Sequence, residues 1–179
     1  MVNEEYVVLQ AVDGNQAAFT QLYDIYFDRV YRYIYVRIRR QDEAQDLTQE
    51  VFIKALKAIE SYRIGKTPFA SWLFRIAHNQ VIDHVRKHKN KIEMSIDQAP
   101  ASVGAEDPVA TIEQRVEVAE LNAAITALTP AQQEVISLRF IAELPIAEVA
   151  RILGKSEGTV KALQFNATIS LRKLLIGRI

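Results

Sequence analysis

The stretch DLTQEVFIKALKAI, residues Asp46 to Ile59, has the spacing of an amphipathic helix. At about 100° per residue, one broad apolar arc contains Leu47, Val51, Phe52, Ala55, Leu56, Ala58 and Ile59. The other side carries Asp46, Gln49, Glu50 and Lys57, and Ile53 falls among them. An isoleucine in that position is either an ordinary exposed side chain or the apolar centre of a surface that binds another protein.

The composition around this helix is that of a globular protein. Of the 179 residues, 49% are apolar and 25% are charged. The chain has no cysteine, which excludes disulfides and thiolate metal sites and is compatible with a reduced intracellular setting. The opening MVNEEYVVLQ lacks the basic start and long apolar run of a secretory signal. No apolar run approaches the length of about 18 residues that spans a membrane, so we expect no membrane insertion.

Charge is unevenly distributed although the net charge is zero. Residues 1–90 carry a balance of +2, residues 91–129 of −5 and residues 130–179 of +3. An acidic middle between two mildly basic ends predicts two lobes and a connector. The segment SIDQAPASVGAEDPVATIE, with its prolines and acids, is typical of a linker. We therefore divide the chain into residues 1–92, a flexible acidic linker at 93–110, and residues 111–179.

Both lobes have helical periodicity, and no segment alternates with the period of two that indicates a strand. The turn at residues 13–15 separates an opening helix from one at 16–40. A helix at about 69–89 follows a loop that contains Gly65 and Pro68. The last third predicts helices at about 111–127, 130–141, 146–153 and 157–175, with Thr129 capping the second of these. The predicted fold is all-α, in two small helical domains.

The segment LPIAEVARILGKSEGTVKALQ has the layout of a helix-turn-helix. Gly154 tolerates the left-handed conformation that ends a helix, and Ser156 is placed to cap the next one. On that next helix the predicted buried stripe is Val160, Leu163, Ala167, Leu171 and Leu174. An ordinary helical hairpin has the same spacing, so the spacing alone leaves DNA binding open.

Five motifs in register then resemble one known family. Residues 46–52 read acid-Leu-x-Gln-Glu-x-Phe, and residues 69–79 read Phe-x-x-Trp-Leu-x-x-Ile-Ala-x-Asn. Asp83-x-x-Arg86 follows, then Leu-Thr-Pro-x-Gln at 128–132 and the terminal helix-turn-helix. The whole arrangement resembles an extracytoplasmic-function sigma factor, a small sigma-70-type initiation factor of bacterial RNA polymerase. The opening AVDGNQAAFTQLYDIY is similar to the start of that family's second region.

The resemblance implies that the 46–59 helix docks on the coiled-coil clamp helices of the polymerase's largest subunit. Residues 1–92 would correspond to the second sigma region and residues 111–179 to the fourth. Ile53 would supply the apolar centre within a polar rim. The implied polymerase-binding set is Asp46, Gln49, Glu50, Ile53 and Leu56.

The resemblance also implies that the loop and helix SYRIGKTPFASWLFRIAHNQVIDHVRKHKNK open the promoter's −10 element. Aromatic and cationic side chains interleave there, which suits single strands. Trp72, Leu73 and Ile76 share a face with Phe69 and are expected in the core. The implied −10 set is Tyr62, Arg63, Lys66, Asn79, Asp83, Arg86 and Lys87, with Lys89 and Lys91 as further phosphate contacts.

The helix-turn-helix would read the −35 element through Ser156, Thr159, Lys161, Gln164, Phe165 and Arg172. Gln164 could pair with an adenine edge and Phe165 could contact a thymine methyl. Leu163, Asn166 and Thr168 stand where family members typically carry arginine. Fewer phosphate contacts predict weaker −35 binding with a smaller salt dependence.

Catalysis and cofactor binding are not indicated by the sequence. It has no glycine-rich phosphate loop, activated nucleophile or carboxylate pair in a plausible pocket. His84 and His88, four residues apart, have the spacing of metal ligands, but no third ligand lies nearby in the sequence. We therefore expect a face that contacts the DNA backbone rather than a metal site.

We therefore interpret the chain as a cytoplasmic sigma factor that directs promoter recognition, −10 melting and initiation for a stress or envelope regulon. Its implied partners are core polymerase, promoter DNA and an anti-sigma protein. The alternative is a sigma-like adapter that binds an anti-sigma protein without productive promoter recognition, which the altered recognition helix motivates. A regulator that uses only its helix-turn-helix would leave the polar face of the 46–59 helix unexplained.

Overall fold

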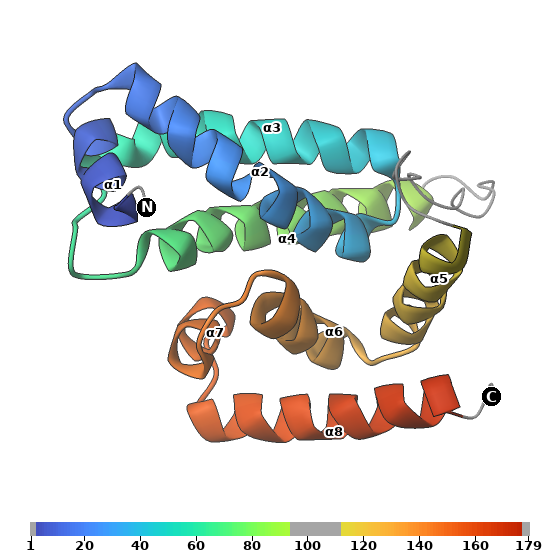
Figure 1. Ribbon diagram of the computed structural model, residues 1–179. Helices are drawn as coiled ribbons and strands as arrows, with labels where there is room; N and C mark the ends of the chain where they lie inside the picture. Colours follow the sequence, from blue (N-terminus) through green and yellow to red (C-terminus); the bar gives the residue numbers. More distant parts are fainter. Residues whose placement is uncertain (1–2, 94–111, 177–179) are drawn as a thin grey trace. The chain divides into compact units, whose positions relative to one another are not determined.

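The computed structural model describes residues 3–93 and 112–176, and the statements below concern these residues. They form helices and turns and no strand, which confirms the all-α prediction (Figure 1). They divide into two compact units, the first made by α1 to α4 and the second by α5 to α8, with residues 39–41 grouped with the second. None of the helices in the described ranges is long and apolar enough to cross a membrane.

The first unit contains α1 (Glu4–Val12), α2 (Gln16–Ile38), α3 (Gln41–Ala58), a 3₁₀ turn η1 (Ile59–Ser61) and α4 (Phe69–Glu93). Helix α1 packs across α2, and α2 packs on α4, as Figure 1 shows in blue and green. The core side chains on α2 are Leu22, Tyr26, Val30, Tyr33 and Ile34. Val51 and Phe52 of α3 and Leu73, Phe74 and Val81 of α4 are also buried in this unit.

Local signals explain where these helices begin and end. Gly14 has a φ of +90°, which lets the chain turn sharply between α1 and α2. The Asn15 side chain then accepts a hydrogen bond from the Ala18 amide at 3.1 Å and caps α2. Helix α2 ends at Ile38, and α4 continues to Glu93, four residues beyond the predicted Lys89. The predicted linker at 93–110 lies outside the described residues except for Glu93.

The second unit contains α5 (Ile112–Thr126), α6 (Pro130–Ile136), a π-helical turn η2 (Ser137–Ile141), α7 (Ile146–Leu153) and α8 (Glu157–Ile176). Helices α5, α6 and α7 each pack on α8. Thr129 caps α6 in a capping box with Gln132, as its position before Pro130 predicts. The π turn was not predicted, and it extends α6 by the i→i+5 bond from the Ala142 amide to the Ser137 carbonyl at 2.9 Å.

Candidate protein and nucleic-acid interfaces

Helix α3 presents a polar face with an apolar centre. Asp46, Gln49 and Glu50 are exposed on it. Ile53 is 52% exposed and Leu56 is 49% exposed. Leu56 belongs to the apolar arc of the sequence and is nevertheless half-exposed, because the buried stripe is narrower there. The centre of the α3 face is therefore two neighbouring apolar side chains rather than one.

Hydrogen bonds hold the polar part of the α3 face to the rest of the unit. The Gln80 side-chain amide nitrogen on α4 donates to the Glu50 carboxylate, and Lys54 Nζ donates to the Gln80 side-chain oxygen Oε1. The Gln49 amide donates to the Tyr23 hydroxyl on α2 at 3.1 Å. These bonds lower the conformational freedom that the side chains would lose on binding a partner. No sequence pattern pairs α3 with Gln80, 30 residues from Glu50.

An aromatic cluster supports α3 from the side of α2. The Tyr23 ring lies 5.0 Å from Phe27 and 4.7 Å from Phe52, centroid to centroid. Tyr31 stacks on Phe27 at 6.4 Å and Tyr35 follows at 5.9 Å. Such pairs add stability beyond the area they bury. Phe52, the member of the cluster on α3, is thereby packed against Tyr23 and Phe27 of α2.

The loop between η1 and α4 exposes cations and buries its tyrosine. Arg63 and Lys66 are exposed, and Gly65, with a φ of +81°, makes the turn between them. Tyr62 is only 8% exposed, and its hydroxyl donates to the Thr67 carbonyl at 2.6 Å. Burial raises the pKa of the Tyr62 hydroxyl. The Tyr62 ring packs against Phe69 and Trp72, so little of it is open for stacking on a base.

Helix α4 continues this surface. Asn79, Arg86, Lys87 and Lys89 are exposed and Asp83 is half-buried, so the helix brings them near one side. Arg86 pairs with Asp83 at 3.1 Å, but their side chains are 70% and 48% exposed, and pairs this open to solvent contribute little stability. Phe69 and Leu73 are buried as expected, whereas Trp72 and Ile76 remain partly exposed. The side chain of Lys91 lies outside the described residues.

Helices α7 and α8 form the expected helix-turn-helix. Gly154 ends α7 in the left-handed conformation, with a φ of +62°. Ser156 Oγ accepts from the Thr159 amide at 3.1 Å, which is the predicted cap of α8. Val160 and Ala167 are buried, and Leu163, Leu171 and Leu174 are partly buried, so the predicted stripe faces inward. Thr159, Lys161, Phe165 and Arg172 are exposed, and Phe165 reaches 67%.

Gln164, which the resemblance implied as a partner for an adenine edge, does not stand free on α8. It is half-buried, and its Oε1 accepts from Arg139 Nε at 2.9 Å. Arg139 lies in the π turn η2 and also donates to the Leu144 carbonyl. A bidentate pair with adenine needs both ends of the amide, so Gln164 would have to exchange its Arg139 bond to form one. Exposed Phe165 needs no such exchange.

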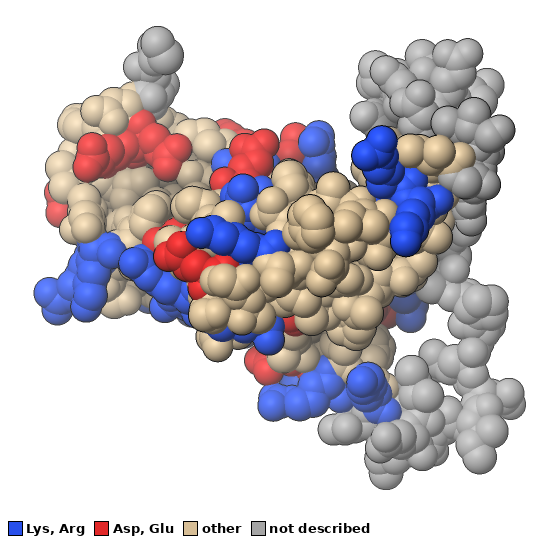
Figure 2. All heavy atoms as spheres, turned by 90° about the horizontal axis from the view of Figure 1, so that it is seen from below, with Lys and Arg blue, Asp and Glu red and all other residues tan. Residues whose placement is uncertain are grey.

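Basic side chains are not concentrated on the face that Figure 2 shows. Lys and Arg of the described residues lie there in several separate groups, with Asp and Glu between some of them. This agrees with the zero net charge of the chain. Binding of nucleic acid would depend on particular side chains more than on a general basic field.

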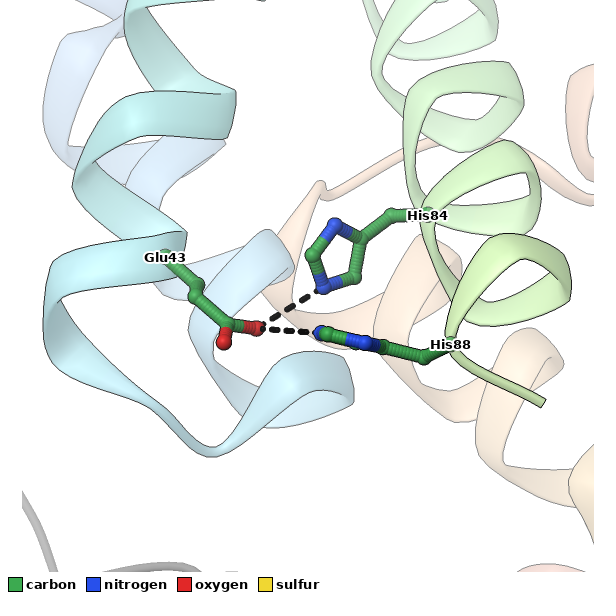
Figure 3. A group of neighbouring side chains, drawn as sticks. All are labelled: Glu43, His84 and His88. Carbon is green, nitrogen blue, oxygen red and sulfur yellow. Dashed lines mark hydrogen bonds and ion pairs between the residues drawn. The ribbon is translucent and has the colours of Figure 1, made fainter. Parts of the chain in front are cut away.

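Glu43, near the start of α3, approaches the two histidines of α4 (Figure 3). Its Oε2 lies 2.8 Å from His84 Nε2 and 3.2 Å from His88 Nε2. All three side chains are partly buried. The sequence offered no third ligand for the histidine pair, and the fold provides Glu43 from 41 residues away. No local signal could have identified it.

Both units are similar to known proteins. Residues 22–91 match the model of sigma-70 region 2, and residues 124–173 match the model of sigma-70 region 4. The extracytoplasmic-function RNA polymerase sigma factor SigW of Bacillus subtilis is 33% identical, over 94% of each chain. The sigma factor BldN of Streptomyces coelicolor is 38% identical over 94% of this chain, which spans 64% of that relative's length.

The fold is also similar to that of a solved complex. The structure of CnrH in complex with the cytosolic domain of CnrY is 25% identical, with a TM-score of 0.74 over 97% of both chains. The two sigma regions occur in the order that the sequence motifs predict. The similarity to SigW extends from one unit to the other. The chain belongs to the extracytoplasmic-function RNA polymerase sigma factors of the sigma-70 family.

Proposed function

We propose that this sigma factor docks on core RNA polymerase through the α3 face, made by Asp46, Gln49, Glu50, Ile53 and Leu56. The observation that carries the proposal is the half-exposed Ile53–Leu56 pair inside a polar rim. Interfaces combine an apolar centre that excludes water with polar groups that fix register. Because Gln49 and Glu50 are already hydrogen-bonded within the unit, part of the rim is ordered before binding.

The loop and α4 would then open the −10 element. Arg63 and Lys66 would hold the phosphates of the displaced strand, and Asn79 would contact a base edge. Arg86 and Lys87 would hold the adjoining duplex, with Asp83 orienting Arg86 through their ion pair. Tyr62 would act indirectly, because its hydroxyl holds the loop in place through the hydrogen bond to the Thr67 carbonyl. A preformed loop reduces the ordering cost that accompanies the unstacking of a base.

Helix α8 would read the −35 element through its exposed side chains. Thr159 and Ser156, at its start, would contact phosphate, and Lys161 and Arg172 would add two charged contacts. Phe165 would meet a thymine methyl. Residues 1–92 and 111–179 would thus be the two promoter-binding domains, with 93–110 as the linker between them. The chain would act by binding alone, without catalysis, and in the cytoplasm, where the polymerase lies.

A charge-reversal experiment tests the docking proposal. Asp46→Lys with Glu50→Lys should abolish assembly with core polymerase in a pull-down, with the circular dichroism of the protein unchanged. The matched control is Asp24→Lys with Asp28→Lys, which reverses two exposed carboxylates at the same spacing on α2. Full assembly by the Asp46 and Glu50 variant would refute the role of α3. An equal loss of assembly in the control would mean that the effect comes from the overall change of charge and not from the α3 face.

Reconstituted transcription tests promoter function. Holoenzyme made with this chain should give factor-dependent run-off transcripts from a set of genomic fragments. Absence of any such transcript from a holoenzyme that does assemble would favour the second candidate, an adapter that binds an anti-sigma protein. The replacement of typical arginines on α8 and the engagement of Gln164 by Arg139 favour that candidate. A similar fold is known in complex with a cytosolic protein domain, so we also propose an anti-sigma partner for this chain.

A further inference from the structure

We propose that Glu43, His84 and His88 bind one divalent transition metal ion, with Zn²⁺ as the best fit. The site joins the start of α3 to the second half of α4, as Figure 3 shows. Two imidazoles and one carboxylate are a ligand set that Zn²⁺ accepts, with a fourth position open to water or to a partner's side chain. The inference goes beyond the proposed function and does not depend on it.

The positions of the donor atoms suit a tetrahedral ion. Histidines four residues apart on a helix lie on one face, one turn apart. Their Nε2 atoms lie 2.8 and 3.2 Å from the same Glu43 oxygen, and the three donor atoms lie within 4.8 Å of one another. Ligands about 2.0–2.1 Å from a tetrahedral ion are about 3.3 Å apart. Small side-chain movements would therefore convert the hydrogen-bonded cluster into a coordination site.

The surroundings of the cluster also favour an ion. His84 and Glu43 are 20% and 19% exposed, so the ion would be partly removed from water, and His88 at 41% leaves a path for entry. Both imidazoles must offer a lone pair at Nε2 to the ion, so each neutral ring would carry its proton on Nδ1. A protonated imidazole cannot bind a metal ion, so the affinity falls as the pH is lowered.

The composition of the chain leaves few other places for such an ion. It contains no cysteine and three histidines, of which two belong to the cluster. The third, His78, is buried and its Nδ1 lies 3.2 Å from the Tyr33 hydroxyl. A single tight site for Zn²⁺ would thus require His84 and His88. The number of Zn²⁺ ions bound per chain therefore reports directly whether the cluster is occupied.

Bound metal would fix two surfaces relative to each other. Asp46 of the α3 face lies one turn beyond Glu43, and Arg86 and Lys87 lie between and beside the histidines in sequence. A metal bridge at this point would prevent the start of α3 from separating from α4. Since hydrogen bonds between partly exposed groups contribute only modestly, the ion would be the stronger link.

The experiment uses the full chain after treatment with EDTA. Calorimetric titration with ZnCl₂ should show one ion per chain, and Co²⁺ should give the visible absorption of a tetrahedral site. Glu43→Gln, His84→Asn and His88→Asn should each weaken Zn²⁺ binding at least 10-fold. Glu60→Gln is the matched control, since it removes an exposed carboxylate beyond the far end of α3 and should leave the affinity unchanged.

The outcomes separate the possibilities. One-to-one binding that the three cluster variants weaken and the control does not would establish the site, and the unfolding temperature should then rise with Zn²⁺ and fall with EDTA. Absence of one-to-one binding, or equal affinity in the variants and the wild type, would overturn the proposal. If Glu43→Gln or His84→Asn fails to fold by circular dichroism, the more exposed His88→Asn decides. Loss of metal binding with polymerase assembly retained would leave the proposed docking function intact.

Discussion

Ile53 and Ile25 form a natural pair for a test at the scale of single residues. Both lie on long helices of the first unit, and they are 52% and 44% exposed. Ile53→Ala should weaken binding to core polymerase at least about 10-fold, because a central apolar contact of an interface contributes more than about 1.4 kcal/mol. Ile25→Ala should leave the affinity unchanged. Fluorescence titration of labelled protein measures both, and equal affinities for the two variants would contradict the special role of Ile53.

Tyr62 allows a test of the buried hydrogen bond under the loop. Tyr62→Phe removes the hydroxyl that donates to the Thr67 carbonyl and should lower the free energy of unfolding by about 1 kcal/mol. Tyr6→Phe, at a side chain that is 61% exposed, should change it by much less. Urea unfolding of the two variants gives the comparison. A loss no larger in Tyr62→Phe would mean that the ring packing alone holds the loop.

Single residues also show which features could be predicted from the sequence and which could not. Ile53 was predicted to project from a polar face, and it does, because a local periodicity defines the faces of a helix. Tyr62 and Gln164 were assigned to DNA-binding sets, yet each side chain is hydrogen-bonded within its own unit. Arg139, which engages Gln164, is 25 residues away, and its position depends on the π turn. Contacts of this range depend on tertiary packing, which no local pattern encodes.

At the scale of elements, helix boundaries followed from local chemistry. The caps at Thr129 and Ser156 and the stop at Gly154 were predicted because each satisfies backbone groups within a few residues. The π turn was missed, because its i→i+5 bond has no residue signature comparable to a cap. Helix existence and order were thus predictable, as was the split into two units, while the partners of α3 on α4 were not.

The turn of the helix-turn-helix provides a test with two glycines. Gly154→Ala should lower the stability of the protein by about 1 kcal/mol, because a Cβ is strained at a φ of +62°. Gly158 lies within α8, where an added Cβ would come only within 3.8 Å of Ser156 Oγ. Gly158→Ala should therefore raise stability, by at most about 1 kcal/mol. Thermal unfolding measures both shifts, and the same sign for the two variants would contradict this account of the turn.

At the scale of the whole molecule, the zero net charge predicts how the free protein meets DNA. Without a general basic field, the free chain should bind nonspecific duplex no more tightly than about 10⁻⁴ M at physiological salt. Promoter binding should appear only after assembly with core polymerase. Fluorescence anisotropy of labelled duplex, with and without core, makes the comparison. Nanomolar binding by the free chain would show that its own surface suffices.

Asn79 and Gln80 are consecutive residues of α4 that point to different surroundings. Gln80 is buried against Glu50 and Lys54 of α3, while Asn79 is exposed on the side proposed to meet the melted strand. An α-helix is stiff over two residues, so if α3 docks on the enzyme as proposed, a shift of α3 would reach Asn79 without passing through a loop. Attachment to the polymerase and separation of the DNA strands, both proposed above, would then be coupled through two consecutive residues of α4.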